Sequence, residues 1–109
     1  MTAPESLALT LRAEAGGRPL RAIEALAALA VNRARLAMAD AAGSQAPLPP
    51  AGDPVLAMCR RVAGRAVAGA LQDPTAGATH WHDADALPGW AVGRVPSAEI
   101  GGLVFYRIE

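Results

Sequence analysis

The 109-residue sequence predicts a single domain of the α+β class, with three helices followed by a small antiparallel sheet. Ala supplies 27 residues, and short Ala/Leu stretches divided by Gly and Pro indicate closely packed helices in the first two thirds. The four aromatic residues, Trp81, Trp90, Phe105 and Tyr106, all lie in the last third, among alternating β-branched residues and turn signals. We therefore expect residues 1–109 to fold as one unit.

The first helix is expected to begin at the capping-box pattern Thr2-Ala3-Pro4-Glu5 and to end before Gly16-Gly17, because Gly readily adopts a left-handed C-cap conformation. On this helix Leu7, Leu11 and Glu14 have the spacing of one face. The Glu14 carboxylate then lies at the end of an apolar stripe, where partial desolvation would raise its pKa. A Glu at a helix end can equally turn to water, and the spacing leaves that alternative open.

The second helix is predicted from Pro19 to about residue 42, with Gly43 as its stop. Its centre, residues 25–31, is apolar on all sides and is therefore expected to be buried. The third helix is predicted to begin at Asp53-Pro54, an N-cap followed by Pro at the first helical position. Its buried stripe is expected to consist of Val55, Cys59, Val62 and Ala66.

The charges balance, with ten Arg, no Lys and ten acidic residues. This balance argues against a general nucleic-acid or anionic-membrane binder, which would carry a basic surplus. On the third helix, Arg60, Arg61 and Arg65 are expected to form a solvated face, with a binding patch as the alternative. No apolar run approaches the roughly 20 residues of a membrane span. The single cysteine, Cys59, excludes an intrachain disulfide.

Two or three short strands are predicted, because residues 79–82 and 103–108 carry β-branched, aromatic and alternating residues and turn signals lie between them. On a strand His80 and His82 point to the same face, and Asp83 or Asp85 could add an oxygen ligand for a metal ion. Because no third ligand position is fixed, we expect structural or substrate-contacting histidines and no metal.

Three of the aromatic residues, Trp81, Trp90 and Tyr106, could form a platform for sugar rings or simply the core beneath the sheet. Trp90 follows the Pro88-Gly89 turn and is expected on an exposed rim. Trp81 is expected in the core, because the histidines on either side of it take the other face of the strand.

Four blocks carry a more specific pattern. They are residues 14–33, which open Glu-Ala-Gly-Gly-Arg-Pro and close Asn-Arg; residues 73–82, Asp-Pro-Thr-Ala-Gly-Ala-Thr-His-Trp-His; residues 88–91, Pro-Gly-Trp-Ala; and residues 100–107, Ile-Gly-Gly-Leu-Val-Phe-Tyr-Arg. In this order they resemble the motifs of the SleB-type cell-wall hydrolases, the spore-cortex-lytic enzymes and their relatives. Arg18 stands where that family usually has Glu, and Leu103 where it often has His. Residues 39–53 form a short Pro-rich segment without the family's Gln-Phe-Ser stretch.

The resemblance implies a lysozyme- or lytic-transglycosylase-like helical core that cleaves peptidoglycan glycan strands, with Glu14 as the acid/base. A single catalytic Glu suits a lytic transglycosylase, because one carboxyl protonates the glycosidic oxygen and later accepts the muramyl hydroxyl proton. A muramidase is the close variant. No cofactor is expected. The residues expected to contact the glycan are Trp90, His80, Tyr106, Thr79 and Trp81.

Two other functions stay open. A non-catalytic member that binds glycan, or is a structural part of a phage-like particle, would fit the missing Gln-Phe-Ser stretch and the absence of a secretory signal. An N-acetylmuramoyl-L-alanine amidase would need a metal at His80 and His82. We expect a monomer made in the cytoplasm that reaches the cell wall by another export route or within a phage-like particle, with peptidoglycan glycan strands as its partner.

Overall fold

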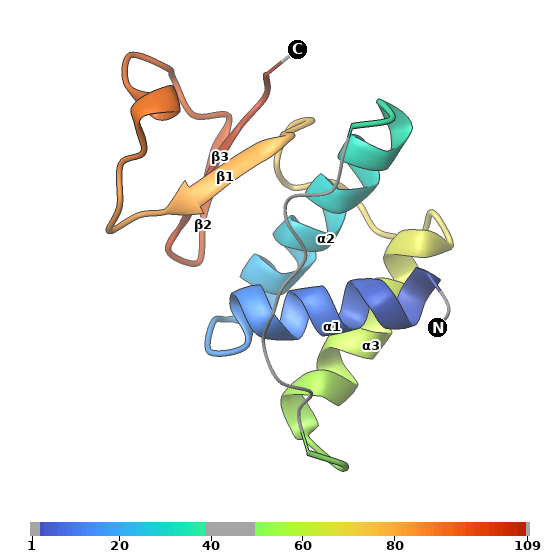
Figure 1. Ribbon diagram of the computed structural model, residues 1–109. Helices are drawn as coiled ribbons and strands as arrows, with labels where there is room; N and C mark the ends of the chain where they lie inside the picture. Colours follow the sequence, from blue (N-terminus) through green and yellow to red (C-terminus); the bar gives the residue numbers. More distant parts are fainter. Residues whose placement is uncertain (1–2, 39–49, 109) are drawn as a thin grey trace.

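The computed structural model describes residues 3–38 and 50–108, and these form three helices beside a three-stranded antiparallel sheet (Figure 1). The helices are α1 (Ala3–Ala15), α2 (Leu20–Arg35) and α3 (Pro54–Val67). The strands are β1 (His80–Asp83), β2 (Ala98–Ile100) and β3 (Leu103–Tyr106), with a short 3-10 helix, η1 (Gly89–Ala91), between β1 and β2. The predicted α+β class is confirmed.

Small side chains allow the helices to pack closely. In α2 every residue from position 25 to 29 is buried, which confirms the predicted buried centre except at its last two positions. At the surface, Arg60 bonds Glu5 at 2.9 Å and Arg65 bonds Glu24 at 3.3 Å, so two of the three expected solvent-facing arginines join α3 to α1 and α2. None of the helices in the described part of the chain combines the length and the apolar character that crossing a membrane requires.

The first helix ends at Ala15 as predicted, but for a different reason. Neither Gly16 nor Gly17 has a positive φ. Instead, a Cβ on Gly16 would collide with the backbone carbonyl oxygen of Arg12, so the chain can leave the helix here only without a side chain. Thr2, the predicted cap, lies outside the described residues.

The predicted end of α2 near residue 42 is wrong, because the helix ends at Arg35. Ala37 adopts a left-handed conformation with φ of 52°. Its N–H donates to the carbonyl oxygen of Ala34 at 3.1 Å, and the N–H of Met38 donates to the carbonyl oxygen of Arg33 at 2.9 Å. This pattern of two bonds is the Schellman motif, which usually has Gly at the left-handed position. Gly43, the expected stop, lies outside the described residues.

The third helix begins where it was predicted to begin. The Asp53 carboxylate accepts the N–H of Leu56 at 3.1 Å as an N-cap and also the Arg12 Nε at 2.6 Å, which ties α1 to the start of α3. The buried stripe differs from the predicted one at its first position, because Leu56 is buried and Val55 is half-buried. The other predicted members, Cys59, Val62 and Ala66, are buried.

The sheet has the order β1-β3-β2, and its register sorts the side chains onto two faces. Trp81 pairs with Phe105, and both belong to the core formed with the helices. His80 pairs with Tyr106, and Tyr106 belongs to a separate cluster with Ala91 of η1. One face therefore packs on the helices, mainly on α2, and η1 covers the other.

At the junction between α2 and the sheet, the sequence block of residues 14–33 is hydrogen-bonded to the block of residues 73–82. The Asn32 amide donates to the Asp73 carboxylate and to the carbonyl of Ala78, each at 3.0 Å. Asp73 also accepts the N–H groups of Thr75 at 2.8 Å and Gly77 at 2.9 Å. Burial acts to raise the pKa of Asp73, but the hydrogen bonds from Thr75 and Asn32 outweigh it and hold the pKa below its ordinary value. Asn32, near the end of the first block, thus binds the segment that leads into β1.

Candidate active site

Glu14 lies in the last turn of α1, between the buried residues Leu11 and Ala15. Its side chain is half-buried, and it forms no hydrogen bond or ion pair with any other residue of the described segments. Burial raises the pKa of Glu14 above its ordinary value of 4.5, and no nearby cation offsets this effect. The structure therefore gives Glu14 the partly desolvated environment predicted from its position on the helix.

A polar corner lies at the turn between α1 and α2, which directly follows the last turn of α1 that carries Glu14. The Arg18 guanidinium bonds the carboxylate of Asp83 at the end of β1, and it donates to the carbonyl of Gly101 at 3.2 Å in the β2–β3 turn. A Cβ on Gly101 would lie 2.7 Å from that of Ala22, so the turn packs directly on the first residues of α2. The end of β1 and the β2–β3 turn are thus held at the end of α1 that carries Glu14.

Sequence reasoning missed this corner, although one signal was present. Arg18 belongs to a block that resembles the SleB-type motifs and departs from the Glu usual there, and Asp83 directly follows another such block, residues 73–82. An Arg in place of Glu calls for an anionic partner, and Asp83 supplies it.

The outer face of the sheet carries a cluster of four rings, formed by His80, His82, Trp90 and Tyr106. The Trp90 ring centroid lies 5.5 Å from that of His80, 5.8 Å from that of His82 and 5.2 Å from that of Tyr106. Trp90 remains 40% exposed, so a large part of its ring surface is open to solvent. Its expected place on an exposed rim is confirmed.

The hydrogen bonds of His82 define its tautomer. Its Nδ1 lies 2.7 Å from the backbone carbonyl oxygen of Asp83, which can only accept, so Nδ1 carries the hydrogen. In the neutral ring Nε2 is then an acceptor, and the Tyr106 hydroxyl donates to it across 2.8 Å. The two rings also stack at a centroid distance of 5.4 Å. The rings of His82 and Tyr106 thus form a hydrogen-bonded pair, and the Trp90 ring packs against both.

His80 and Thr79 connect the ring cluster to the end of the chain. Thr79 is buried, and its Oγ1 lies 2.9 Å from Nδ1 of His80, 3.1 Å from the carbonyl oxygen of Ile108 and 3.2 Å from the N–H of Ile108. Burial, together with the positive charges of Arg33 and Arg94, lowers the pKa of His80. The neutral imidazole is therefore favoured at this position.

The structure divides the residues that were expected to contact substrate. Trp90, His80 and Tyr106 lie together, as the sequence suggested, but on the sheet face turned away from the helices. Trp81 lies on the opposite face, where it is partly buried against the core as predicted. Because Asp83 is two residues further along β1, it shares this inner face and bonds Arg18 in the α1–α2 turn.

The histidines share a face, as predicted for a strand. Asp83, considered with them as a possible metal ligand, projects from the other face and is bonded to Arg18. Within residues 3–38 and 50–108, no group of three or more His, Cys, Asp or Glu side chains is placed to hold a metal ion.

Two solved structures have folds similar to that of this chain. The chain superposes on the catalytic domain of the Bacillus cereus SleB protein with a TM-score of 0.68 and 20% identity, covering 96% of this chain and 89% of that one. It matches the catalytic domain of the germination-specific lytic transglycosylase SleB from Bacillus anthracis with a TM-score of 0.68 and 21% identity, covering 96% and 93%. No protein-family model matches the sequence, and no curated protein does. The chain thus has the fold of the SleB catalytic domain, and the resemblance is confirmed at the level of fold.

Proposed function

We propose that this protein cleaves the glycan strands of peptidoglycan, as a lytic transglycosylase or a muramidase, with Glu14 as its acid/base. The observation that carries the proposal is the state of Glu14: a half-buried carboxyl with no ion-pair partner among the described residues, at the end of the first helix of a SleB-like fold. A carboxyl whose pKa is raised by burial keeps a larger protonated fraction at neutral pH, which a general acid requires.

In the transglycosylase reaction a single carboxyl is sufficient. The protonated Glu14 gives its proton to the glycosidic oxygen, and the bond from that oxygen to the muramyl carbon breaks as the leaving sugar departs. The resulting carboxylate then takes the proton of the same muramyl residue's C6 hydroxyl, whose oxygen closes on the sugar carbon to form an anhydro ring. Glu14 ends protonated again, and no water enters the reaction.

The muramidase variant needs a water nucleophile or a second free carboxylate instead. At this corner the other carboxylate is Asp83, which is bonded to Arg18 and also accepts the N–H of Asp85 at 3.1 Å. Its oxygens are therefore engaged in holding the sheet to the helical corner. This arrangement supports the transglycosylase over the muramidase.

Glycan contacts are proposed on both faces of β1. Trp81 lies on the inner face of β1 with Asp83, partly buried against the helical core, and is the aromatic glycan contact proposed on that face. Trp90, with His80 and Tyr106, offers an exposed ring on the outer face. A flat aromatic face with polar neighbours suits stacking on a sugar, so Trp90 would bind a part of the strand away from the cleaved bond.

The proposal is tested by mass analysis of the products released from purified cell-wall sacculi. Anhydro-muramic ends are expected, and they should disappear with Glu14→Gln. Reducing muramic ends would indicate the muramidase, and freed peptides would indicate the amidase. The absence of any product from the folded wild-type protein would contradict the proposal and favour a binding role.

A further inference from the structure

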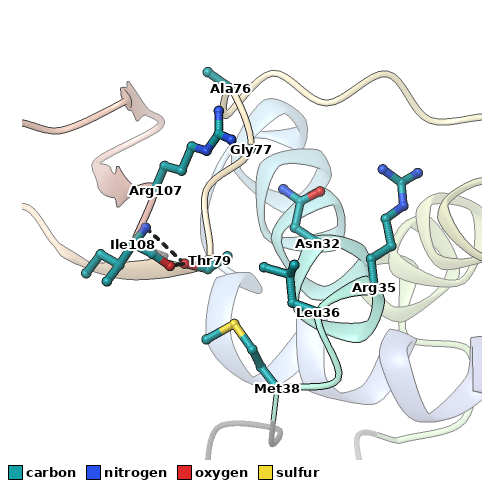
Figure 2. Close-up of a pocket in the computed structure, with 9 residues that line it drawn as sticks. All are labelled: Asn32, Arg35, Leu36, Met38, Ala76, Gly77, Thr79, Arg107 and Ile108. Carbon is teal, nitrogen blue, oxygen red and sulfur yellow. Dashed lines mark hydrogen bonds between the residues drawn. The ribbon is translucent and has the colours of Figure 1, made fainter.

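A concave feature lies at the end of α2 that is remote from Glu14. A cavity of about 770 Å³ lies between the end of α2 and the segments that flank the sheet. Figure 2 shows the residues that line it. A cavity of this volume falls in the range that accommodates small ligands, roughly 300–1,000 Å³. Its lining residues are Asn32, Arg35, Leu36, Met38, Ala76, Gly77, Thr79, Arg107 and Ile108.

The lining combines positive charge with an apolar surface. The guanidinium groups of Arg35 and Arg107 lie on opposite walls, and Leu36, Met38 and Ile108 supply the apolar side chains of the lining. The described lining contains no acidic residue. Arg35 forms no hydrogen bond or ion pair with another described residue, so its charge is available to a ligand.

Among the described acidic side chains, Asp73 contacts a residue of this lining, and its bonds are to groups other than Arg35. Asp73, which contacts the lining residue Asn32, already accepts hydrogen bonds from Asn32, Gly77 and Thr75. A ligand that fits the cavity therefore carries a carboxylate for the arginines and small aliphatic groups for the apolar wall. The glycan strand of peptidoglycan carries N-acetyl methyl groups but no free carboxylate where stems are attached, whereas its peptide stems present carboxylates beside the methyl groups of alanine.

We propose that this cavity binds the peptide stem of peptidoglycan through Arg35 and the apolar wall of Leu36, Met38 and Ile108. The inference rests on the proposed function, because it takes the same polymer as substrate. Glu14 lies near the start of α2 and the cavity at its end, which are separated by the 16 residues of the helix, roughly 24 Å. The bound stem therefore belongs to a sugar beyond the cleaved one. It strengthens substrate binding without taking part in bond cleavage.

The inference is tested by NMR titration of the whole protein with N-acetyl-L-Ala-γ-D-Glu, a soluble stem fragment with two carboxylates and a methyl group. We expect the backbone amide signals of residues 35–38 and of Gly77 to shift. Arg35→Gln removes the charge and Leu36→Gln removes an apolar contact, so each should weaken binding about fivefold. Both side chains are exposed, so neither change should disturb folding. Arg61→Gln, at an exposed arginine on α3, is the matched control and should bind as the wild type does.

Three results would overturn the inference: no shift at the cavity, equal binding of the uncharged diamide of the fragment, or equal affinity of the Arg35 and Arg61 variants. The peptide titration involves no cleavage, so it separates this inference from the proposed function. A protein that binds the fragment but cuts no sacculi would contradict only the proposed reaction. A protein that cuts sacculi but does not bind the fragment would contradict only the stem site.

Discussion

Arg18 bonds the Asp83 carboxylate and the Gly101 carbonyl oxygen, and it thereby joins the α1–α2 corner to the end of β1 and to the β2–β3 turn. The SleB-type motif usually has Glu at this position, and a Glu here would face Asp83 with a like charge. The bond to Asp83 therefore depends on Arg at this position, and through it the sheet is held to the turn that directly follows α1.

Reversing the charge of Arg18 tests this relationship. Arg18→Glu should lower the free energy of unfolding by about 1–2 kcal/mol, since it removes a partly exposed ion pair and creates a repulsion. It should also reduce sacculus cleavage, because the sheet is no longer held at the Glu14 corner. The double variant Arg18→Glu/Asp83→Arg should recover part of both losses. A double variant as impaired as the sum of the two single variants would show that the residues act independently.

Glu14→Gln should keep the fold and abolish cleavage. The amide preserves the shape of the side chain, and no described partner is lost, so the melting temperature should not fall. The rate of sacculus cleavage should fall at least about a hundredfold, the usual size of a general-acid contribution. Glu99→Gln, at an exposed Glu on β2, is the control and should cleave normally. Turnover by Glu14→Gln at the wild-type rate would contradict the assigned role.

The raised pKa of Glu14 also predicts a pH dependence of stability. A carboxyl whose pKa is higher in the folded than in the unfolded protein favours folding when protonated, and this contribution is lost as the pH rises above 4.5 through the folded-state pKa. Glu14→Gln removes this loss. Its unfolding free energy should therefore exceed that of the wild type at pH 7, and the difference should shrink below pH 4.5. Thermal unfolding of both proteins from acid to neutral pH measures this difference, and a gap that is constant across the range would contradict the prediction.

Asn32 should be essential for docking the sheet segment on α2. Its amide donates both hydrogens, one to Asp73 and one to the carbonyl of Ala78. Asn32→Asp replaces these donors with a carboxylate that faces Asp73, and we expect a loss of about 2–4 kcal/mol in urea unfolding at neutral pH. Asn32→Ala should cost less, about 1–2 kcal/mol, because it adds no repulsion. Equal losses for the two variants would show that the charge of Asp73 does not matter here.

The fold class, the end of α1, the start of α3 and the two faces of β1 were predictable from the sequence. Each of them depends on local rules. Gly, Pro and Asp mark helix ends through their own chemistry, and alternation assigns His80 and Trp81 to opposite faces. The end of α2 could not be predicted, because Ala37 adopts a left-handed conformation that its type disfavours. The cavity could not be predicted either, since helix and sheet residues distant in sequence line it together.

The two tryptophans should behave differently when they are removed, because they lie on opposite faces of the sheet. Trp81 is partly buried against the helical core, so Trp81→Ala should cost about 3 kcal/mol in urea unfolding, the range of a large-to-small change in a packed site. Trp90 is 40% exposed, and Trp90→Ala should cost only about 1 kcal/mol while weakening the binding of peptide-free glycan. Trp90→Phe keeps a flat ring and should retain part of that binding. If Trp90→Ala bound glycan as the wild type does, the ring cluster would be a structural cover of the sheet, and the glycan contacts would have to lie on the inner face with Trp81.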